Sequence, residues 1–245
     1  MTLGIAGGGR AAWAYGSAWR RIGWPIAGVW LRESSTSPLP ELLEAPRRDL
    51  GALDCDLLLL AVSDRAVGEV AALVPATRAV LFHASGALPA VRDGFSLHPL
   101  KSLPPVGQPS DLEGSLLVFE GAHRETASRV ASAVGARFAE ITAAQKALYH
   151  AGAVFGSNYV AALLEIAERL IGIDGAREDI ARLALSAVEN WRAHEGAQRF
   201  TGPAARGDSA VMQGHLAALR ESPQLAEAYK LLAAEIERAI LASQK

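Results

Sequence analysis

The chain has 245 residues, half of them hydrophobic, so it can bury a large core and form one large domain or two modest ones. Its 24 basic and 26 acidic side chains give a net charge of −2, which offers no basic surface for nucleic acid or an anionic membrane. The single cysteine, Cys55, and six scattered histidines supply neither a disulfide framework nor a metal-binding motif. We therefore expect a cytoplasmic globular protein that acts on a small molecule and binds no metal.

The first strand and first helix are predicted around a glycine-rich turn. The apolar run Thr2 to Ala6 passes directly into Gly-Gly-Gly-Arg-Ala-Ala, which fits the pattern Gly-x-Gly-x-x-Ala of dinucleotide-binding folds. Its first glycine makes the turn, its second lets backbone N–H groups approach a pyrophosphate, and its alanine packs helix on strand. Any tight strand-to-helix turn favours glycine, which is the alternative. The predicted cofactor residues here are Gly7, Gly8, Gly9, Arg10 and Ala12.

The end of the second predicted strand indicates which dinucleotide is bound. A helix over 11–22 and a strand over 26–31 complete a β-α-β unit, after which the chain reads Leu-Arg-Glu-Ser-Ser. An NAD site carries Asp or Glu at that strand end, whereas here Arg32 can clamp the 2′-phosphate of NADP and Ser34 can add donors. A solvated loop arginine is the alternative, and Glu33, one position later, counts against the clamp. The residues favour NADP over NAD.

Five more strands, over 57–62, 79–82, 95–101, 116–119 and 137–141, are predicted to extend a doubly wound sheet of roughly eight strands, with helices over 41–50, 65–73 and 123–134. In such sheets ligands bind outside the carboxyl ends of the strands. Four residues at or just beyond the ends of these strands are predicted site residues for that reason. They are Ser63 and Ser85 for the cofactor, and His98 and Lys101 for the substrate.

From Thr142 onward the pattern is helical, beginning with the capping-box pair Thr142 and Gln145. We therefore predict two domains, 1–141 and 142–245. Lys146 and His150 lie one helical turn apart, and a cation and an imidazole on one face suit proton transfer beside a carbon that receives hydride. They are the predicted catalytic residues. The alternatives are a solvated lysine in the first turn and an ordinary core histidine.

Further predictions concern the rest of the helical half. Asn158 and the guanidinium of Arg206, in the glycine-rich loop 201–208, are predicted substrate contacts, whereas Asp208 is expected to cap the next helix. The apolar segment 147–167 contains His150, Asn158 and other polar residues, so we expect a buried helix and not a membrane span. Its small apolar residues predict an interdomain or homodimer interface.

Seven segments spread over nearly the whole chain resemble one bacterial family. They are Gly7-Gly8-Gly9, 61–64, 83–86, 96–101, 146–150, 157–159 and 201–208. That family pairs a Rossmann-like domain with domain of unknown function 2520, and its members are provisionally described as NADP-dependent oxidoreductases. The resemblance implies an α/β fold: a Rossmann-like doubly wound sheet followed by an all-helical domain like the C-terminal domain of 6-phosphogluconate dehydrogenase.

The chain is more distantly similar to pyrroline-5-carboxylate reductases and β-hydroxyacid dehydrogenases. In the latter a catalytic lysine opens the first interdomain helix, with asparagine one turn later. Lys146 stands in the similar place, but His150 replaces the asparagine. The resemblance implies hydride transfer between NADP(H) and a small carbonyl, imine or alcohol by a homodimer formed through the helical domain. A non-catalytic dinucleotide sensor is the alternative, and an adenosyl-type ligand is a third hypothesis.

Overall fold

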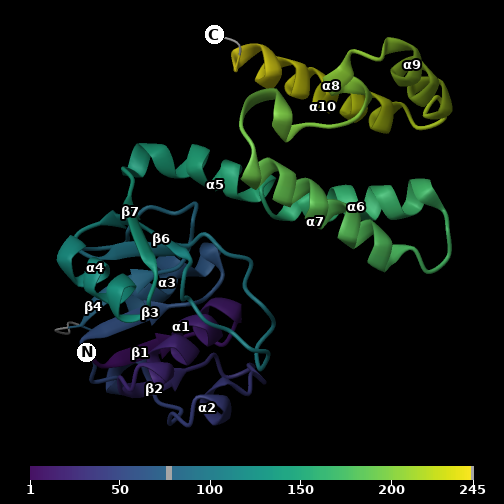
Figure 1. The fold of residues 1–245 in the computed structure, drawn as a ribbon. Helices are drawn as coiled ribbons and strands as arrows, with labels where there is room; N and C mark the ends of the chain where they lie inside the picture. Colours follow the sequence, from purple (N-terminus) through teal and green to yellow (C-terminus); the bar gives the residue numbers. More distant parts are fainter. Residues whose placement is uncertain (76–78, 244–245) are drawn as a thin grey trace. The chain divides into compact units, whose positions relative to one another are not determined.

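The computed structural model describes residues 1–75 and 79–243, and the chain divides into two compact units, Met1–Tyr159 and Val160–Lys245 (Figure 1). The first unit contains the sheet and the second contains only helices. The predicted boundary at residue 142 marks the end of the sheet. The next helix nevertheless belongs to the first unit, because its side chains bond to the strands.

The first unit contains a doubly wound sheet, as predicted, with seven strands in the described residues instead of roughly eight. The strands are β1 (Leu3–Ala6), β2 (Ile26–Trp30), β3 (Leu57–Leu60), β4 (Val80–His83), β5 (Phe95–Pro99), β6 (Leu116–Gly121) and β7 (Arg137–Glu140). Their spatial order is β2-β1-β3-β4-β5-β6-β7, and every neighbouring pair is parallel except β5 and β6. The chain leaves β1 toward one edge and continues from β3 toward the other. The switch point of the sheet is therefore between β1 and β3.

The helices of the first unit follow the predictions closely, with one exception. They are α1 (Arg10–Arg21), α2 (Leu39–Leu42), η1 (Leu50–Ala52), α3 (Asp64–Leu73), α4 (Arg124–Ala133), η2 (Ala143–Gln145) and α5 (Lys146–Phe155). The helix predicted over 41–50 is wrong: α2 ends at Leu42, and Arg47 instead forms a parallel bridge with Val29 of β2. The capping box of Thr142 and Gln145 is confirmed.

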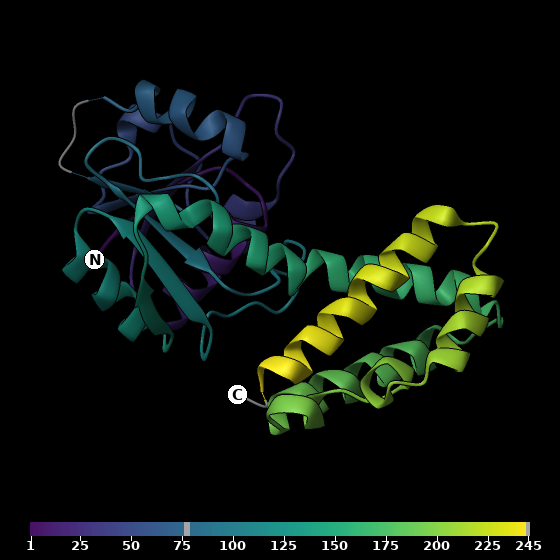
Figure 2. The same cartoon turned by 90° about the horizontal axis from the view of Figure 1, so that it is seen from above.

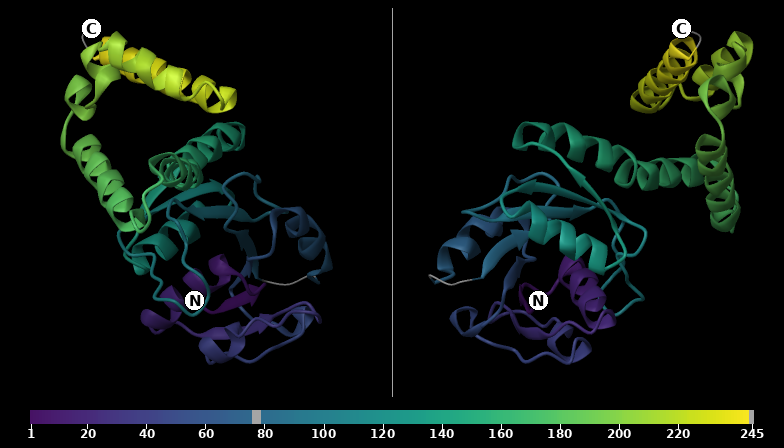
Figure 3. Two further views of the ribbon diagram at one scale, coloured as in Figure 1. Left: turned by 90° about the vertical axis from the view of Figure 1, so that its right-hand side faces the viewer. Right: turned by 60° about the vertical axis from the view of Figure 1, so that its left-hand side comes forward.

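Both faces of the sheet are covered. Helices α1 and α4 pack on one face and α3 packs on the other (Figure 3). The continuous leucine run of β3 reflects this arrangement, because Leu57 and Leu59 join the core under α1 while Leu58 and Leu60 join the core under α3. A strand buried on both faces has no polar alternation to reveal its period.

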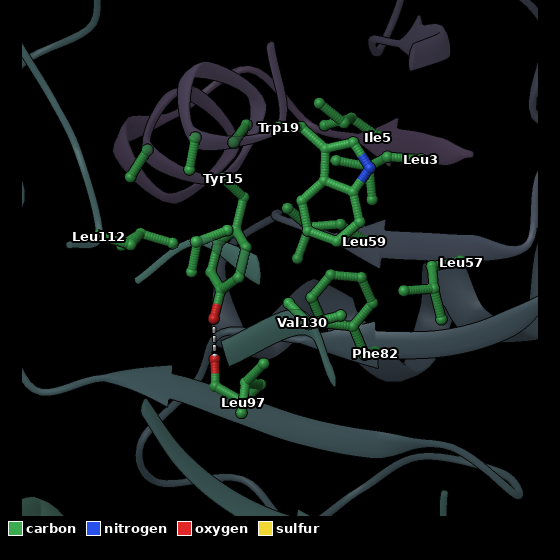
Figure 4. Close-up of a cluster of buried hydrophobic side chains, with 14 of the residues drawn as sticks. Leu3, Ile5, Tyr15, Trp19, Leu57, Leu59, Phe82, Leu97, Leu112 and Val130 are labelled. Atoms are coloured by element: carbon green, nitrogen blue, oxygen red, sulfur yellow. Dashed lines mark hydrogen bonds between the residues drawn. The ribbon is translucent and has the colours of Figure 1, made fainter. Parts of the chain in front are cut away.

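The larger core is built around aromatic side chains (Figure 4). Tyr15 of α1 meets Phe82 of β4 edge to face at 5.6 Å, and Phe82 stacks on Phe95 of β5 at 5.1 Å. The fully buried Tyr15 hydroxyl donates to the carbonyl of Leu97, so it is paired inside the core. These contacts hold β4 and β5 in fixed positions beneath the site described below.

The second unit consists of helices (Figure 2). They are α6 (Asn158–Ile171), α7 (Arg177–Ala193), η3 (Gly196–Arg199), α8 (Pro203–Arg206), α9 (Ser209–Ala218) and α10 (Pro223–Ala242). In residues 160–243 only Ile180 and Ala233 are buried apolar residues. None of the helices in the described ranges combines the length and the apolar character that a membrane span requires.

Candidate functional site

The glycine turn after β1 is shaped by the end of β3. Gly7 adopts φ +125°, and a Cβ atom there would lie 2.2 Å from the carbonyl oxygen of Ala61, so only glycine fits. Gly9 differs, because a Cβ atom added to it would have no atom within 4 Å. Gly7 thus makes the turn, and Gly9 leaves the N-terminus of α1 open for an approaching ligand.

A pocket of about 270 Å³ lies beside this turn, at the switch point of the sheet. It brings together five of the predicted cofactor residues: Gly7, Gly8, Gly9, Arg32 and Ser63. Arg32 is exposed, and its guanidinium lies 3.8 Å from the carboxylate of Glu69, a surface pair that leaves most donors of the arginine unused. A nucleotide phosphate fits this donor set, since glycine backbone, a helix N-terminus and an arginine meet at one pocket.

The other four predicted cofactor residues do not line this pocket. Arg10 is exposed at the start of α1, where its side chain lies 3.4 Å from the Leu103 carbonyl, and Ser34 is exposed in the loop after β2. Ala12 is fully buried and packs α1 onto the sheet. Ser85 belongs to the loop after β4: its hydroxyl donates to Asp64 and accepts the amides of residues 87 and 88.

A row of buried polar side chains crosses the sheet beside this loop. His83 of β4 is in register with Ser96 of β5, and Ser96 lies directly opposite Glu120 of β6, so the three side chains share one face. The Lys146 ammonium covers the row, 2.5 Å from the Ser96 hydroxyl and 3.9 Å from the Glu120 carboxylate. In residues 1–75 and 79–243 these are the four buried residues with charged or hydrophilic side chains.

Lys146 is held entirely by groups of the first unit. Its ammonium also donates to the carbonyl of Ser85 at 3.3 Å, and the residue is only 2% exposed. Burial lowers the pKa of Lys146, and the carboxylates of Glu120 and Asp64 oppose that shift. The role of Lys146 as a proton donor stays a prediction, and in the described residues its ammonium is engaged by Ser96 and the Ser85 carbonyl.

The buried row also fixes the loop after β4. His83 Nδ1 accepts the amide of Ser85, so Nε2 carries the proton and donates to the Pro89 carbonyl at 3.0 Å. The Glu120 carboxylate accepts the amide of Ala90 at 2.8 Å. Burial lowers the pKa of His83, which keeps the ring neutral in this arrangement. The loop 84–90 is therefore pinned at both ends.

His98, Tyr149 and His150 meet above this loop. The Tyr149 hydroxyl lies 2.6 Å from His98 Nδ1, and the rings of His98 and His150 meet edge to face at 5.9 Å. Gly86 lies beneath both histidines, because a Cβ atom there would be 2.5 Å from His150 Nδ1 and 3.1 Å from His98 Nε2. Nδ1 of His150 is buried and has no hydrogen-bond partner among the described residues. The structure thus brings the predicted residues His98 and His150 together.

The remaining predicted substrate residues are Lys101, Asn158 and Arg206. Lys101 bonds to the carboxylate and the carbonyl of Asp111 at about 3.0 and 2.9 Å, and Asn158 is exposed at the start of α6. Arg206 is exposed in α8 of the second unit. Asp208 accepts the amide of Val211, so its predicted capping role is confirmed.

The sequence interpretation missed Ser96, Glu120 and Tyr149. Ser96 and Glu120 become neighbours only through the antiparallel pairing of β5 and β6, which no local pattern reveals. Tyr149 carried a usable signal, because it lies three residues after Lys146 and so on nearly the same helix face. The role of Gly86 depends on the two imidazoles above it and has no signature of its own.

A comparison with known protein families gives one match, which covers part of the sheet and most of the helical region. Residues 117–236 match the family model described as "Domain of unknown function (DUF2520)". The chain carries a DUF2520 domain. The match begins in β6 and includes Glu120, Lys146, Tyr149 and His150, so it covers much of the buried row and the cluster above it. None of the curated proteins matches the chain.

Solved structures share the fold over the whole length of this DUF2520 protein. A Bacteroides fragilis protein provisionally named an NADP oxidoreductase is 22% identical with a TM-score of 0.80, and covers 97% of this chain and 98% of its own. Protein TM1727 from Thermotoga maritima is 20% identical with a TM-score of 0.77, over 99% and 100%. The reductive aminase of Aspergillus terreus, solved with NADPH and ethyl levulinate, is 17% identical with a TM-score of 0.66, over 98% and 94%.

Proposed function

We propose that this DUF2520 protein is an NADP-dependent oxidoreductase that transfers hydride between NADP(H) and a small carbonyl, imine or alcohol. The observation that carries the proposal is the pocket at the switch point, where the open glycine turn, the N-terminus of α1 and Arg32 meet. NADPH, when bound, supplies the hydride. The residues of the chain bind the cofactor, orient the substrate and supply the proton.

The proposed cofactor-binding residues suit different parts of the dinucleotide. The open backbone at Gly9 and the N-terminus of α1 suit the pyrophosphate, and Gly7 keeps the turn tight against β3. The exposed guanidinium of Arg32, at the end of β2, suits the additional phosphate of NADP, which it can bind in bidentate fashion.

The similar structures support a nicotinamide dinucleotide. The reductive aminase of Aspergillus terreus holds NADPH and an imine reductase of Myxococcus stipitatus holds NADP⁺. The prephenate dehydrogenase of A. aeolicus holds NAD⁺ on the same fold. The choice of NADP over NAD in the present chain therefore rests on Arg32.

Replacing Arg32 tests this choice directly. We expect Arg32→Ala to weaken NADPH binding 10- to 100-fold and to leave NADH binding unchanged, because one charge-assisted arginine–phosphate contact contributes about 1.5–3 kcal/mol. Fluorescence titration with both dinucleotides measures the two constants. Arg129→Ala is the matched control, since Arg129 is an exposed arginine on α4. Equal losses for NADPH and NADH, or no loss at all, contradict the proposed clamp.

A turnover assay distinguishes the proposed oxidoreductase from the alternative, a non-catalytic dinucleotide-binding sensor. NADPH oxidation is followed at 340 nm with panels of aldehydes, ketones and imines, and NADP⁺ reduction with the matching alcohols. Saturable NADPH binding with no turnover in either direction would favour the sensor. We expect turnover, because the cluster of His98, Tyr149 and His150 places titratable groups at the carboxyl end of β5.

We also propose that the protein is a homodimer formed through its helical unit. Large apolar side chains of this unit are exposed, including Leu183, Leu185, Trp191 and Leu231, all between 57% and 65%. With two buried apolar residues in 160–243, the unit lacks a core of its own, and a second copy would supply the missing cover. Sedimentation velocity is expected to give twice the mass of 25.8 kDa, and a monomer would exclude this arrangement.

A further inference from the structure

Two groups at the start of α5 reach the sheet in different ways. Lys146 enters the buried polar row, whereas Tyr149, three residues later, meets His98 at the end of β5. We propose that Tyr149 is the proton donor of the reaction, that His98 positions it, and that the substrate is consequently an aldehyde or ketone. The inference rests on the proposed hydride transfer and deepens it.

The protonation states of the pair suit a donor and its partner. Burial raises the pKa of Tyr149 to about 12, so the hydroxyl keeps its proton at neutral pH. Burial, with smaller contributions from His150 and Lys146, lowers the pKa of His98 to about 4. Before the reaction the pair therefore consists of a protonated phenol and a neutral imidazole. Both side chains are uncharged, and the proton remains on Tyr149.

The neutral ring of His98 can serve Tyr149 in two tautomers. With its proton on Nε2, His98 accepts the Tyr149 hydroxyl at Nδ1, across the observed 2.6 Å. With its proton on Nδ1, it donates to the phenol oxygen, which frees the hydroxyl proton to point toward a substrate. The second tautomer also stabilises the phenolate that remains after the proton leaves.

The neighbouring residues are less suited to this role. Lys146 is 2% exposed and its ammonium is already bonded to Ser96 and the Ser85 carbonyl, whereas a proton donor must face the substrate. His150 has no hydrogen-bond partner at Nδ1 in the described part of the chain, so no protein group there orients its ring as His98 orients Tyr149. Tyr149 is half-buried and has a bonded partner.

The proton requirement indicates the substrate class. When hydride adds to a carbonyl carbon, the C=O π electrons move to oxygen, and the resulting alkoxide takes the proton from the Tyr149 hydroxyl. Water then reprotonates the phenolate. An alkoxide is a stronger base than a phenolate, so this transfer is favourable. A neutral imine must be protonated at nitrogen before hydride adds, and a phenol with a pKa of about 12 is too weak an acid for that step. A preformed N-alkyl iminium ion becomes a neutral amine on hydride addition and needs no proton at the reacting atoms.

Tyr149→Phe separates the two reactions, because it removes one hydroxyl and keeps the ring. We expect reduction of the aldehydes and ketones in the panel by NADPH to fall 100- to 10,000-fold, the usual contribution of a general acid. Reduction of N-methyl-3,4-dihydroisoquinolinium and the NADPH dissociation constant should stay within threefold of the wild-type values. Tyr229→Phe is the matched control. Tyr229 lies 2.8 Å from His215 Nδ1 in the second unit, with the same edge-to-face geometry, and its loss should change neither reaction.

A measurement without cofactor tests the contact itself. The ¹⁵N chemical shifts of the His98 ring should change in Tyr149→Phe and stay constant in Tyr229→Phe. His98→Asn, which can place an amide near the position of Nδ1, should retain more carbonyl reduction than His98→Leu. Unchanged carbonyl reduction in Tyr149→Phe, equal loss of both reactions, or constant His98 shifts would overturn the assignment. Wild-type reduction of the iminium but of no carbonyl would overturn the substrate class alone, whereas NADPH binding without any turnover would refute the proposed function.

Discussion

The buried pair of Lys146 and Glu120 allows a quantitative test of the site's architecture. The two side chains are 2% and 9% exposed, and their charged atoms lie 3.9 Å apart. At an effective dielectric constant of about 20, this separation corresponds to an attraction of roughly 4 kcal/mol. Lys146→Met removes this attraction and the bond to Ser96. It also removes the free-energy cost of burying the lysine charge, the same desolvation that lowers the lysine pKa, and this offsets part of the loss. We expect the first unit to lose about 3 kcal/mol of stability.

Urea unfolding followed by tryptophan fluorescence measures this loss. Four of the five tryptophans lie in the first unit, so the signal reports mainly on it. Glu120→Gln supplies the second arm of a double-mutant cycle, and the coupling energy between the two changes should reach at least about 2 kcal/mol. The matched control is Lys230→Met, because Lys230 pairs with Glu227 at 2.8 Å while both are more than half exposed. That change should cost less than about 0.5 kcal/mol.

Three results would refute the reasoning about this pair. They are a loss below about 1 kcal/mol for Lys146→Met, additive single variants with no coupling, and a control variant as damaging as the buried one. The first two would mean that the ammonium and the carboxylate do not interact in the buried interior of the first unit, and the third would mean that burial does not set the size of the loss.

Two further predictions concern the glycine turn and the pH dependence of stability. Gly7→Ala should destabilise the first unit by several kcal/mol, because the φ of Gly7 is +125° and a Cβ there would clash with Ala61. Gly9→Ala should leave the melting temperature unchanged and weaken NADPH binding at least tenfold. Calorimetry and NADPH titration compare the two variants, and equal melting temperatures would contradict the assigned roles. His98 has its pKa lowered from 6.5 to about 4, so the unfolded chain binds more protons between these values and stability falls as pH drops through this window, by about 3 kcal/mol in total. Thermal melts from pH 7 to 4 should show a smaller decline for His98→Asn than for the wild type, and equal declines would exclude the shift.

The sequence predicted those features that depend on local pattern. The first β-α-β unit, the glycine turn and the end of β2 with Arg32 lie within a short stretch, and the structure brings Gly7, Gly9 and Arg32 to one pocket. The helix predicted over 41–50 failed because Arg47 pairs with Val29 of β2, a contact between distant positions. The turn made by residues 201–208 was recognised as a loop, although its central residues form the short helix α8.

The role of Lys146 was harder to predict because the sequence does not reveal the depth of a side chain. A lysine in a first helical turn is ordinarily solvated, and the row that buries this one exists only when β4, β5 and β6 align His83, Ser96 and Glu120. The correct register depends on the antiparallel return of β6, which follows a loop of 16 residues, from Leu100 to Ser115, with no helix or strand.

Burial of Lys146 has a consequence for the chemistry proposed for Tyr149. Lys146 is the only residue of α5 that is fully buried, so apolar packing contributes little to the position of this helix on the sheet. The bonds of the ammonium to Ser96 and to the Ser85 carbonyl must then set the position of its first turns. Lys146→Met should therefore slow aldehyde reduction through misplacement of the Tyr149 hydroxyl, although the ammonium bonds only to protein groups in the described residues. The ¹⁵N shifts of His98 distinguish this from direct catalysis by lysine, because they change in Lys146→Met only if the Tyr149–His98 contact depends on the anchor.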